Sequence, residues 1–445
     1  MATAYHVQVP PTDSGILKFA QTGSSAAKVS ELLQKDLEVN HHVFFNASGF
    51  HNHIVHYLLT LYGTGAGPDI LEKAYIHNAS YQIHASQPSS EVVSELQAGF
   101  GANSPKYLGK GKHYADFLAF FQAEIDSKGW KAVLTQYLFR NDGDPMAHDL
   151  LGRLYAGFLH PMIQLMFGIE WQQPVIVAEA LAQTAVHENK LGAFLEQAEG
   201  RANERDPPYR PLAEFFEELG SGEQHRKLAT SAHWDDPNRI YDGVMKRAPD
   251  EALDLVSSIK VQPQDLDERT VEMLHTTAYV AAAAAWHPPH IPKFDFFLIH
   301  HLTSAPIFLT VNAQPWIPTS TKIRLLEWKM RLDVVEYVAR GAPPLHPEIL
   351  RTYSVPPGDH PRDLLPRFHD IVDDGHTIKV VRALLIAQEE TRRFAGSPWV
   401  RIREEDWVRV HHLLLRGVMQ GQSTQERWVR SAGFDEAWAD VPKEE

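Results

Sequence analysis

Residues 26–39 of the chain read AAKVSELLQKDLEV and place Val29, Leu32, Leu33 and Leu37 on one stripe, with charged residues opposite. Apolar residues that recur every three or four positions predict an amphipathic α-helix. The same kind of pattern recurs at 112–126, 129–139, 147–168, 175–198, 267–285, 320–339, 374–394 and 405–419. The sequence therefore predicts an all-α fold.

Other local signals bear on how the chain is divided. HVQVP at 6–10 is a short strand candidate, and no alternation of strands and helices appears. The proline-bearing stretches 199–211 and 340–363 are typical of linkers and also of long loops within one domain. Since no repeat of fixed period is present, we predict one large helical domain with long proline-rich loops over 26–445, after an N-terminal extension at 1–25.

Composition narrows the function classes. A formal net charge of −14 argues against nucleic acid, because phosphate binding needs a basic face. The N-terminus lacks the basic and apolar regions of a secretory signal. TAYVAAAAAW at 277–286 is too short to cross a bilayer and favours a tightly packed core helix. We therefore expect a cytoplasmic protein without a membrane segment.

Several familiar motifs are missing. No G-x-G-x-x-G follows a strand and no Walker loop is present, so neither a Rossmann nor a P-loop nucleotide site is supported. The G-x-S-x-G elbow of serine hydrolases and the H-E-x-x-H of zinc peptidases are also absent.

Histidine placement is the most informative feature that remains. The chain has 25 histidines and no cysteine, so only nitrogen and oxygen donors are available. Several histidines lie in long apolar segments: NHIVHYLLTLYG (52–63), LYAGFLHPMIQLMFG (154–168), FDFFLIHHLTS (294–304) and GHTIKVVRALLIA (375–387). Neutral imidazole is the commonest transition-metal ligand, so buried histidines on separate helices indicate a shared site. For each segment alone, a core histidine bonded to a carbonyl is the simpler interpretation.

Spacing distinguishes some of these residues. His53 and His56 are three apart and share a helix face. His300 and His301 are adjacent and differ by about 100° around a helix, so we expect one inside and the other peripheral.

The segment around Lys379 allows two interpretations. Lys379 follows His376 by three positions and precedes an apolar run. A solvated lysine whose stem covers the surface is the simple one. A buried lysine beside a metal would instead be neutral, and could bind the metal or react with carbon dioxide to give a carbamate ligand. Arg382 could then pair with that carbamate or with an acidic substrate group.

Taken together, GFHNHIVHYLLTLYGTGA, GFLHPMIQLMFGIE, KFDFFLIHHLTSAPIF and DDGHTIKVVRAL, in this order over about residues 40–395, resemble the questin oxidase-like family of fungal and bacterial secondary metabolism. The resemblance implies oxidative opening of anthraquinone and related polyketide rings. Some members are described as Baeyer–Villiger-type oxidases that use NADPH without an obvious flavin fold. The missing Rossmann fingerprint agrees with that property.

Carried over residue by residue, the resemblance implies a metal site and two catalytic residues, His376 and Lys379. The implied ligands are His56, His160, His300, His376 and Lys379. His53 also matches and is held in reserve for His56, whereas Gln164 departs from the histidine expected in many relatives. Nitrogen donors with one oxygen donor suit iron, and dioxygen chemistry needs a redox metal, so we expect iron(II).

We therefore predict a non-haem iron oxygenase that cleaves a carbon–carbon bond of an anthraquinone-type substrate with O2. Plausible substrate contacts are Tyr57, Phe294, Phe297 and Arg382. One alternative is a metal-free, NADPH-dependent Baeyer–Villiger monooxygenase whose histidines act as acids and bases. A second is a non-catalytic helical protein.

Overall fold

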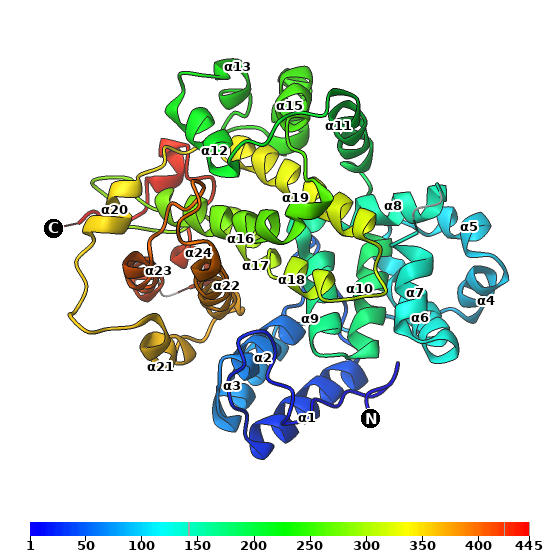
Figure 1. Ribbon diagram of the computed structural model, residues 1–445. Coiled ribbons are helices and arrows are strands. Elements are labelled where there is room, and N and C mark those ends of the chain that lie inside the picture. Colours follow the sequence, from blue (N-terminus) through cyan, green and yellow to red (C-terminus); the bar gives the residue numbers. More distant parts are fainter. Residues whose placement is uncertain (141–142, 422, 445) are drawn as a thin grey trace. The chain divides into compact units, whose positions relative to one another are not determined.

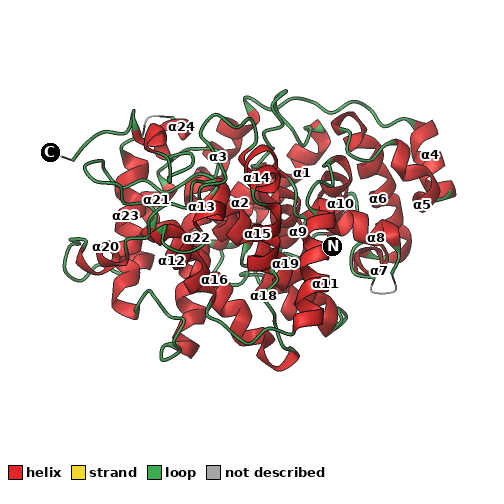
Figure 2. Ribbon diagram, turned by 90° about the horizontal axis from the view of Figure 1, so that it is seen from above, coloured by secondary structure: helices red, strands yellow, loops and turns green. Residues whose placement is uncertain are grey.

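The structure is a computed structural model that describes residues 1–140, 143–421 and 423–444. Most of these residues are helical, and Figure 2 shows helices joined by loops, with no strand in the described parts of the chain. Extended backbone pairs there only in isolated bridges, such as that between His41 and His84. The prediction of an all-α fold is confirmed.

The chain forms two compact units, each built from three segments that are not contiguous in sequence. The first unit comprises Met1–Ala193, Leu309–Thr321 and Val372–Arg382. The second comprises Phe194–Phe308, Lys322–Ile371 and Ala383–Glu445. No single cut of the sequence separates the units, which agrees with the prediction of one helical domain.

Most helices of the first unit come from the first 190 residues. They are α1 (Gly23–Val39), α2 (Ile54–Gly63), α3 (Pro68–Ala79), α4 (Ser90–Ala98), α5 (Phe100–Asn103), α6 (Tyr114–Lys128), α7 (Trp130–Tyr137), α8 (Pro145–Leu154), α9 (His160–Glu170) and α10 (Pro174–Val186). Helix α10 packs against α6 and α9, and α2 packs against α1, α3 and α9 (Figure 1). The predicted stripe of α1 faces this core, with Val29, Leu32 and Leu33 buried and Leu37 partly buried.

The second unit is built around α16 (Leu266–Ala283). Its other helices are α12 (Leu212–Ser221), α13 (Arg226–Ala229), α14 (Met245–Arg247), α15 (Pro249–Val256), α17 (Leu298–Ser304), α20 (Pro347–Thr352), α21 (Leu365–His369), α23 (Trp407–Met419) and α24 (Thr424–Arg427). Helices α11 (Gly192–Arg205), α18 (Ile307–Asn312), α19 (Thr319–Ala339) and α22 (His376–Thr391) contribute residues to both units.

The alanine-rich end of α16 is a packed core helix, as predicted. Its alanines are almost fully buried, because small side chains let neighbouring backbone approach closely. Among the described helices, none combines the length and the apolar character needed to cross a membrane.

The predicted strand at 6–10 is wrong. This segment is extended, but its backbone bonds to side chains of α1 and to Gln173, which precedes α10, rather than to a second strand. The Val7 amide donates to Gln34 Oε1 and the Val9 amide donates to Ser30 Oγ, each at 2.9 Å. An alternating pattern signals an extended segment with one buried face, and a helix can cover that face as well as a sheet.

Two other boundaries also differ from prediction. Helix α11 continues to Arg205, inside the break proposed at 199–211, and α20 lies within the proposed loop at 340–363. Helix α19 is not amphipathic, because the charged residues from Glu327 onward are buried as ion pairs one turn apart. These pairs are Glu327–Arg331, Lys329–Asp333 and Glu336–Arg340.

Candidate metal centre

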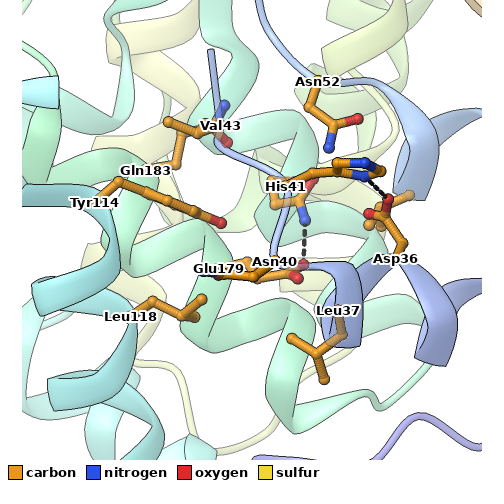
Figure 3. Close-up of a pocket in the computed structure, with 12 residues that line it drawn as sticks. Asp36, Leu37, Asn40, His41, Val43, Asn52, Tyr114, Leu118, Glu179 and Gln183 are labelled. Atoms are coloured by element: carbon orange, nitrogen blue, oxygen red, sulfur yellow. Dashed lines mark hydrogen bonds and ion pairs between the residues drawn. The ribbon is translucent and has the colours of Figure 1, made fainter. Parts of the chain in front are cut away.

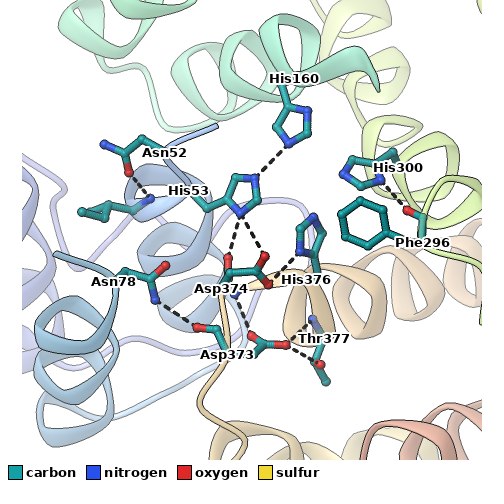
Figure 4. Close-up of polar contacts among 12 residues, drawn as sticks. Asn52, His53, Asn78, His160, Phe296, His300, Asp373, Asp374, His376 and Thr377 are labelled. Atoms are coloured by element: carbon teal, nitrogen blue, oxygen red, sulfur yellow. Dashed lines mark hydrogen bonds and ion pairs between the residues drawn. The ribbon is translucent and has the colours of Figure 1, made fainter. Parts of the chain in front are cut away.

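Three histidines from distant parts of the chain meet in the first unit (Figure 4). His53 immediately precedes α2, while His160 and His376 are the first residues of α9 and α22. One ring nitrogen of each lies within 4.8 Å of those of the other two, and all three rings are buried. Three helix starts therefore direct imidazoles into one space.

The outer contacts of these rings determine where their protons lie. His53 Nδ1 donates to the main-chain carbonyl of Asp374 at 2.9 Å, and His376 Nδ1 donates to the carboxylate of the same residue at 2.7 Å. His160 Nδ1 donates to the Gly157 carbonyl at 2.7 Å. Because these acceptors carry no hydrogen, Nδ1 holds the proton and Nε2 presents a lone pair in each neutral ring.

With the protons on Nδ1, the three rings direct only Nε2 lone pairs, and no hydrogen, into the centre of the cluster. His53 Nε2 and His160 Nε2 face each other at 2.9 Å, and in two neutral rings both are acceptors. A bound cation would relieve this contact. A proton is disfavoured, because burial, together with Lys379 and the neighbouring histidines, holds the pKa of His53 well below its usual value. A metal ion, which binds neutral imidazole, fits these donors.

A second histidine pair lies beside the cluster and is satisfied without an ion. His51 Nε2 and His187 Nε2 are 2.9 Å apart, and His187 Nδ1 donates to the Gln183 carbonyl at 2.6 Å. His51 can supply the hydrogen of this contact, and its ring stacks on that of His160 with centroids 3.9 Å apart. Sequence reasoning missed this pair. In the sequence, the one local hint of this pair was that His51 lies two positions before His53.

His56 and Lys379 place further unsatisfied nitrogen atoms in the same unit. No described residue offers a hydrogen-bond partner of good geometry to either ring nitrogen of His56 or to the Nζ of Lys379. The ring centroid of His56 lies 5.8 Å from that of His53 and 6.3 Å from that of His160. Buried polar atoms without partners are costly, so these atoms also suit a bound ion or a modification.

The environment of Lys379 decides between its two interpretations. Its side chain is only 3% exposed, so the solvated lysine is wrong. Burial lowers the pKa of its amine to about 8, against the opposing effect of Asp374 and Asp373. Burial and Lys379 hold the pKa of His56 well below its usual value, against the opposing effect of the nearby Gln164 amide. A neutral Lys379 amine is therefore accessible near physiological pH.

The backbone before His160 is strained. Gly157, Phe158 and Leu159 all have positive φ angles, of 57°, 53° and 65°. A Cβ at Gly157 would lie 2.3 Å from His187 Nε2, so only glycine fits there. Two consecutive non-glycine residues in this region carry a cost that persists only where surrounding packing enforces it, and such strain clusters at functional sites.

The remaining predicted ligand lies in the second unit. His300 is on α17, is 1% exposed and donates from Nδ1 to the Phe296 carbonyl at 2.6 Å. His301 is also buried and bonds to the Asp333 carboxylate, so the expectation that one of the two is peripheral is wrong. The role of His300 as a ligand stays a prediction.

The four predicted substrate contacts, Tyr57, Phe294, Phe297 and Arg382, differ in their protein neighbours. Tyr57 on α2 and Phe294 are buried, and the Arg340 guanidinium lies 4.1 Å from the ring centroid of Phe297. Arg382 is buried and its guanidinium pairs with the Glu170 carboxylate, so it already has a protein partner. The substrate-contact roles of these residues stay predictions.

A separate polar cavity of about 30 Å³ lies among α1, α6, α9 and α10 (Figure 3). It is lined by Asp36, His41, Tyr114, Glu179 and other residues. Burial and Asp36 raise the pKa of Glu179 to about 8, although the Gln164 amide donates to it at 2.8 Å. The cavity has room for about two water molecules and is far smaller than a site for a polycyclic ligand.

Comparison with known proteins identifies the family. Residues 50–384 match the questin oxidase-like family. The chain belongs to that family. It is 34% identical to oxidoreductase AflY of Aspergillus parasiticus, over 99% of this chain and 94% of that protein. It is 34% identical to Baeyer-Villiger oxidase AgnL3 of Paecilomyces divaricatus, over 98% of this chain and 96% of that protein. Against questin oxidase of Aspergillus fumigatus it is 32% identical, over 99% and 100%.

The family resemblance and the assignment to the oxidoreductases are thereby confirmed. This questin oxidase-like protein is an enzyme, and the non-catalytic alternative is wrong. The matched region includes the turn and helix starts that carry His53, His160 and His376.

Proposed function

We propose that this enzyme is a non-haem iron oxygenase that uses O2 to open a ring of an anthraquinone-type polyketide. The names of its relatives support the reaction class. The observation that carries the metal is the contact between His53 Nε2 and His160 Nε2, two acceptors 2.9 Å apart beside a third buried histidine.

For the ligands we propose His53, His160 and His376 as the core of the site. Their common grouping supports His53, rather than His56, as the ligand from the start of α2. His56 then lines the site, and a ligand role of His300 stays a prediction of the family resemblance alone. Iron(II) bound there would supply the redox chemistry that activates O2.

Lys379 provides the oxygen donor in this proposal. Its neutral amine attacks carbon dioxide, so that an Nζ–C bond forms and one amine proton is released to solvent, leaving a carbamate. The low pKa of the amine supports this reaction, because an ammonium group cannot attack. Lys379 and His376 lie one helical turn apart on α22 and so can serve the same ion.

The chain's other residues would bind and shield the substrate. Tyr57, Phe294 and Phe297 are the proposed stacking residues for a flat ring system. Burial favours the neutral imidazole of His53 and His56, whose pKa values lie well below the usual value, and it excludes water from the clustered rings.

Metal analysis of the purified protein tests the proposal. We expect about one iron per chain, lost in His160→Ala and His376→Ala, while His300→Ala tests the ligand role that the family resemblance implies for His300. Full iron content in His300→Ala would refute its role and point to His301. For Lys379, 13C NMR under labelled carbon dioxide should give a carbamate signal that is missing in Lys379→Ala.

The alternative is a metal-free, NADPH-dependent Baeyer–Villiger monooxygenase. The name of the relative AgnL3, a Baeyer-Villiger oxidase, favours that type of reaction. Monooxygenation inserts one atom of O2 and reduces the other to water with two electrons from NADPH. Dioxygenation incorporates both atoms and needs no external reductant. Labelling with 18O2, with and without NADPH, separates the two reactions, and full turnover of metal-free protein would refute the iron.

A further inference from the structure

Asp374 contacts two of the three clustered histidines through two different oxygen atoms (Figure 4). Its main-chain carbonyl accepts from His53 Nδ1 at 2.9 Å, and its carboxylate Oδ1 accepts from His376 Nδ1 at 2.7 Å. The second carboxylate oxygen lies 3.7 Å from His53 Nδ1. One residue therefore touches ligands that are 323 positions apart in the chain.

The turn that carries Asp374 is held on both sides. The Asp373 carboxylate accepts from the amides of Gly375 at 2.7 Å and Thr377 at 3.1 Å, which caps the start of α22. The Asp373 carbonyl accepts from Asn78 Nδ2 at 3.0 Å. Gly375 has a φ of 91°, and a Cβ there would lie 2.8 Å from Tyr57 Cβ. These contacts fix the main chain of the turn and with it the direction of the Asp374 carbonyl, while the Asp374 carboxylate lies against His376.

We propose that Asp374 is a positioning residue that orients His53 and His376 together and directs the lone pair of each Nε2 into the cluster. This inference rests on the proposed metal site, but the orientation itself belongs to the protein without metal. A carboxylate or carbonyl on the outer nitrogen of a ligand histidine fixes its tautomer and raises its basicity. Asp374 performs this for two rings and binds no metal itself.

Because His53 and His376 contact different oxygen atoms of Asp374, replacing the Asp374 side chain should affect His376 and spare His53. Asp374→Ala removes the carboxylate that accepts from His376 Nδ1 and leaves the main-chain carbonyl that accepts from His53. His376 should then lose its single tautomer, whereas His53 should keep its own. Asp374→Asn keeps an acceptor oxygen of the same shape without the charge, so His376 should keep its tautomer but bind metal less tightly.

The first experiment uses metal-free protein with 15N-labelled histidine and reads the tautomers by NMR. We expect a mixed tautomer for His376 in Asp374→Ala, and the wild-type pattern for His53 there and for both rings in Asp374→Asn. An unchanged His376 in Asp374→Ala would overturn the proposal. This readout remains decisive even if the wild-type protein binds no metal, in which case the proposed function fails by itself.

The second experiment measures Co²⁺ affinity by visible absorption. We expect affinity to fall about 10-fold in Asp374→Asn and about 100-fold in Asp374→Ala, the range seen when such outer partners are lost. Asp116→Asn is the matched control, because Asp116 forms another Asp–His pair of 2.7 Å, with His113, in the same unit. Equal affinities in wild type and both Asp374 variants, or an equal loss in Asp116→Asn, would overturn the proposal.

Discussion

Replacing Lys379 by methionine should stabilise the metal-free protein while abolishing activity. The Lys379 amine is buried and its Nζ has no hydrogen-bond partner among the described residues. Its pKa falls from 10.5 to about 8 on folding, chiefly because of burial. Each pKa unit is worth about 1.4 kcal/mol, so the charged amine costs the folded state about 3 kcal/mol. Methionine fills a similar volume without that charge.

The pH dependence of this effect has a definite sign. Between pH 8 and 10.5 the unfolded chain binds a proton that the folded protein does not, so wild-type stability rises with pH across this window. Below pH 8 the folded state bears the full free-energy cost of burying the charged Lys379 amine. Lys379→Met should therefore be more stable than wild type by about 3 kcal/mol at pH 7, and the difference should disappear towards pH 10.5.

Thermal unfolding of metal-free protein in buffers free of carbon dioxide measures this difference. Unfolding entropy is about 2.1 cal/mol/K per residue, so for 445 residues the gain corresponds to a rise in Tm of about 3 to 4 °C at pH 7. Lys73→Met, at an exposed position on α3, removes the same charge from the surface and should leave Tm unchanged. A Lys379→Met protein no more stable than wild type at pH 7 would refute the argument.

Three further predictions concern the histidine cluster and the polar cavity. His376→Ala should lower iron content and activity together, as measured by metal analysis and turnover; full iron in this variant would exclude it as a ligand. Gly157→Ala should lower Tm well beyond Gly49→Ala, because both have positive φ but only the first places a Cβ against His187 Nε2; equal losses would contradict that clash. The folded protein holds the Glu179 proton more tightly than the unfolded chain does, so wild-type stability should fall as pH rises from about 4.5 to 8. Glu179→Gln should remove this fall, which Tm measured across that pH range checks. Identical Tm profiles for wild type and variant would count against a raised pKa of Glu179.

Local sequence was sufficient for most of the helices. Apolar spacing on 26–39 predicted α1, because a helix that buries one face needs side chains at that period whatever its neighbours are. The same reasoning failed where long-range contacts supply the partners. The segment at 6–10 alternates like a strand, but it bonds to side chains of α1 instead. Helix α19 was predicted correctly at 320–339; what its sequence did not show is that its charged residues are buried in ion pairs one turn apart.

The same division holds for the site. Sequence alone determined the supply of donors: histidines in apolar segments, no thiols, and a lysine one turn after His376. Tertiary structure decided which of them meet, since His53 is 107 positions from His160 and 321 from the carbonyl that orients it. It also decided that Lys379 is buried and that Asp374 holds two rings, because burial and ring orientation depend on residues distant in the chain.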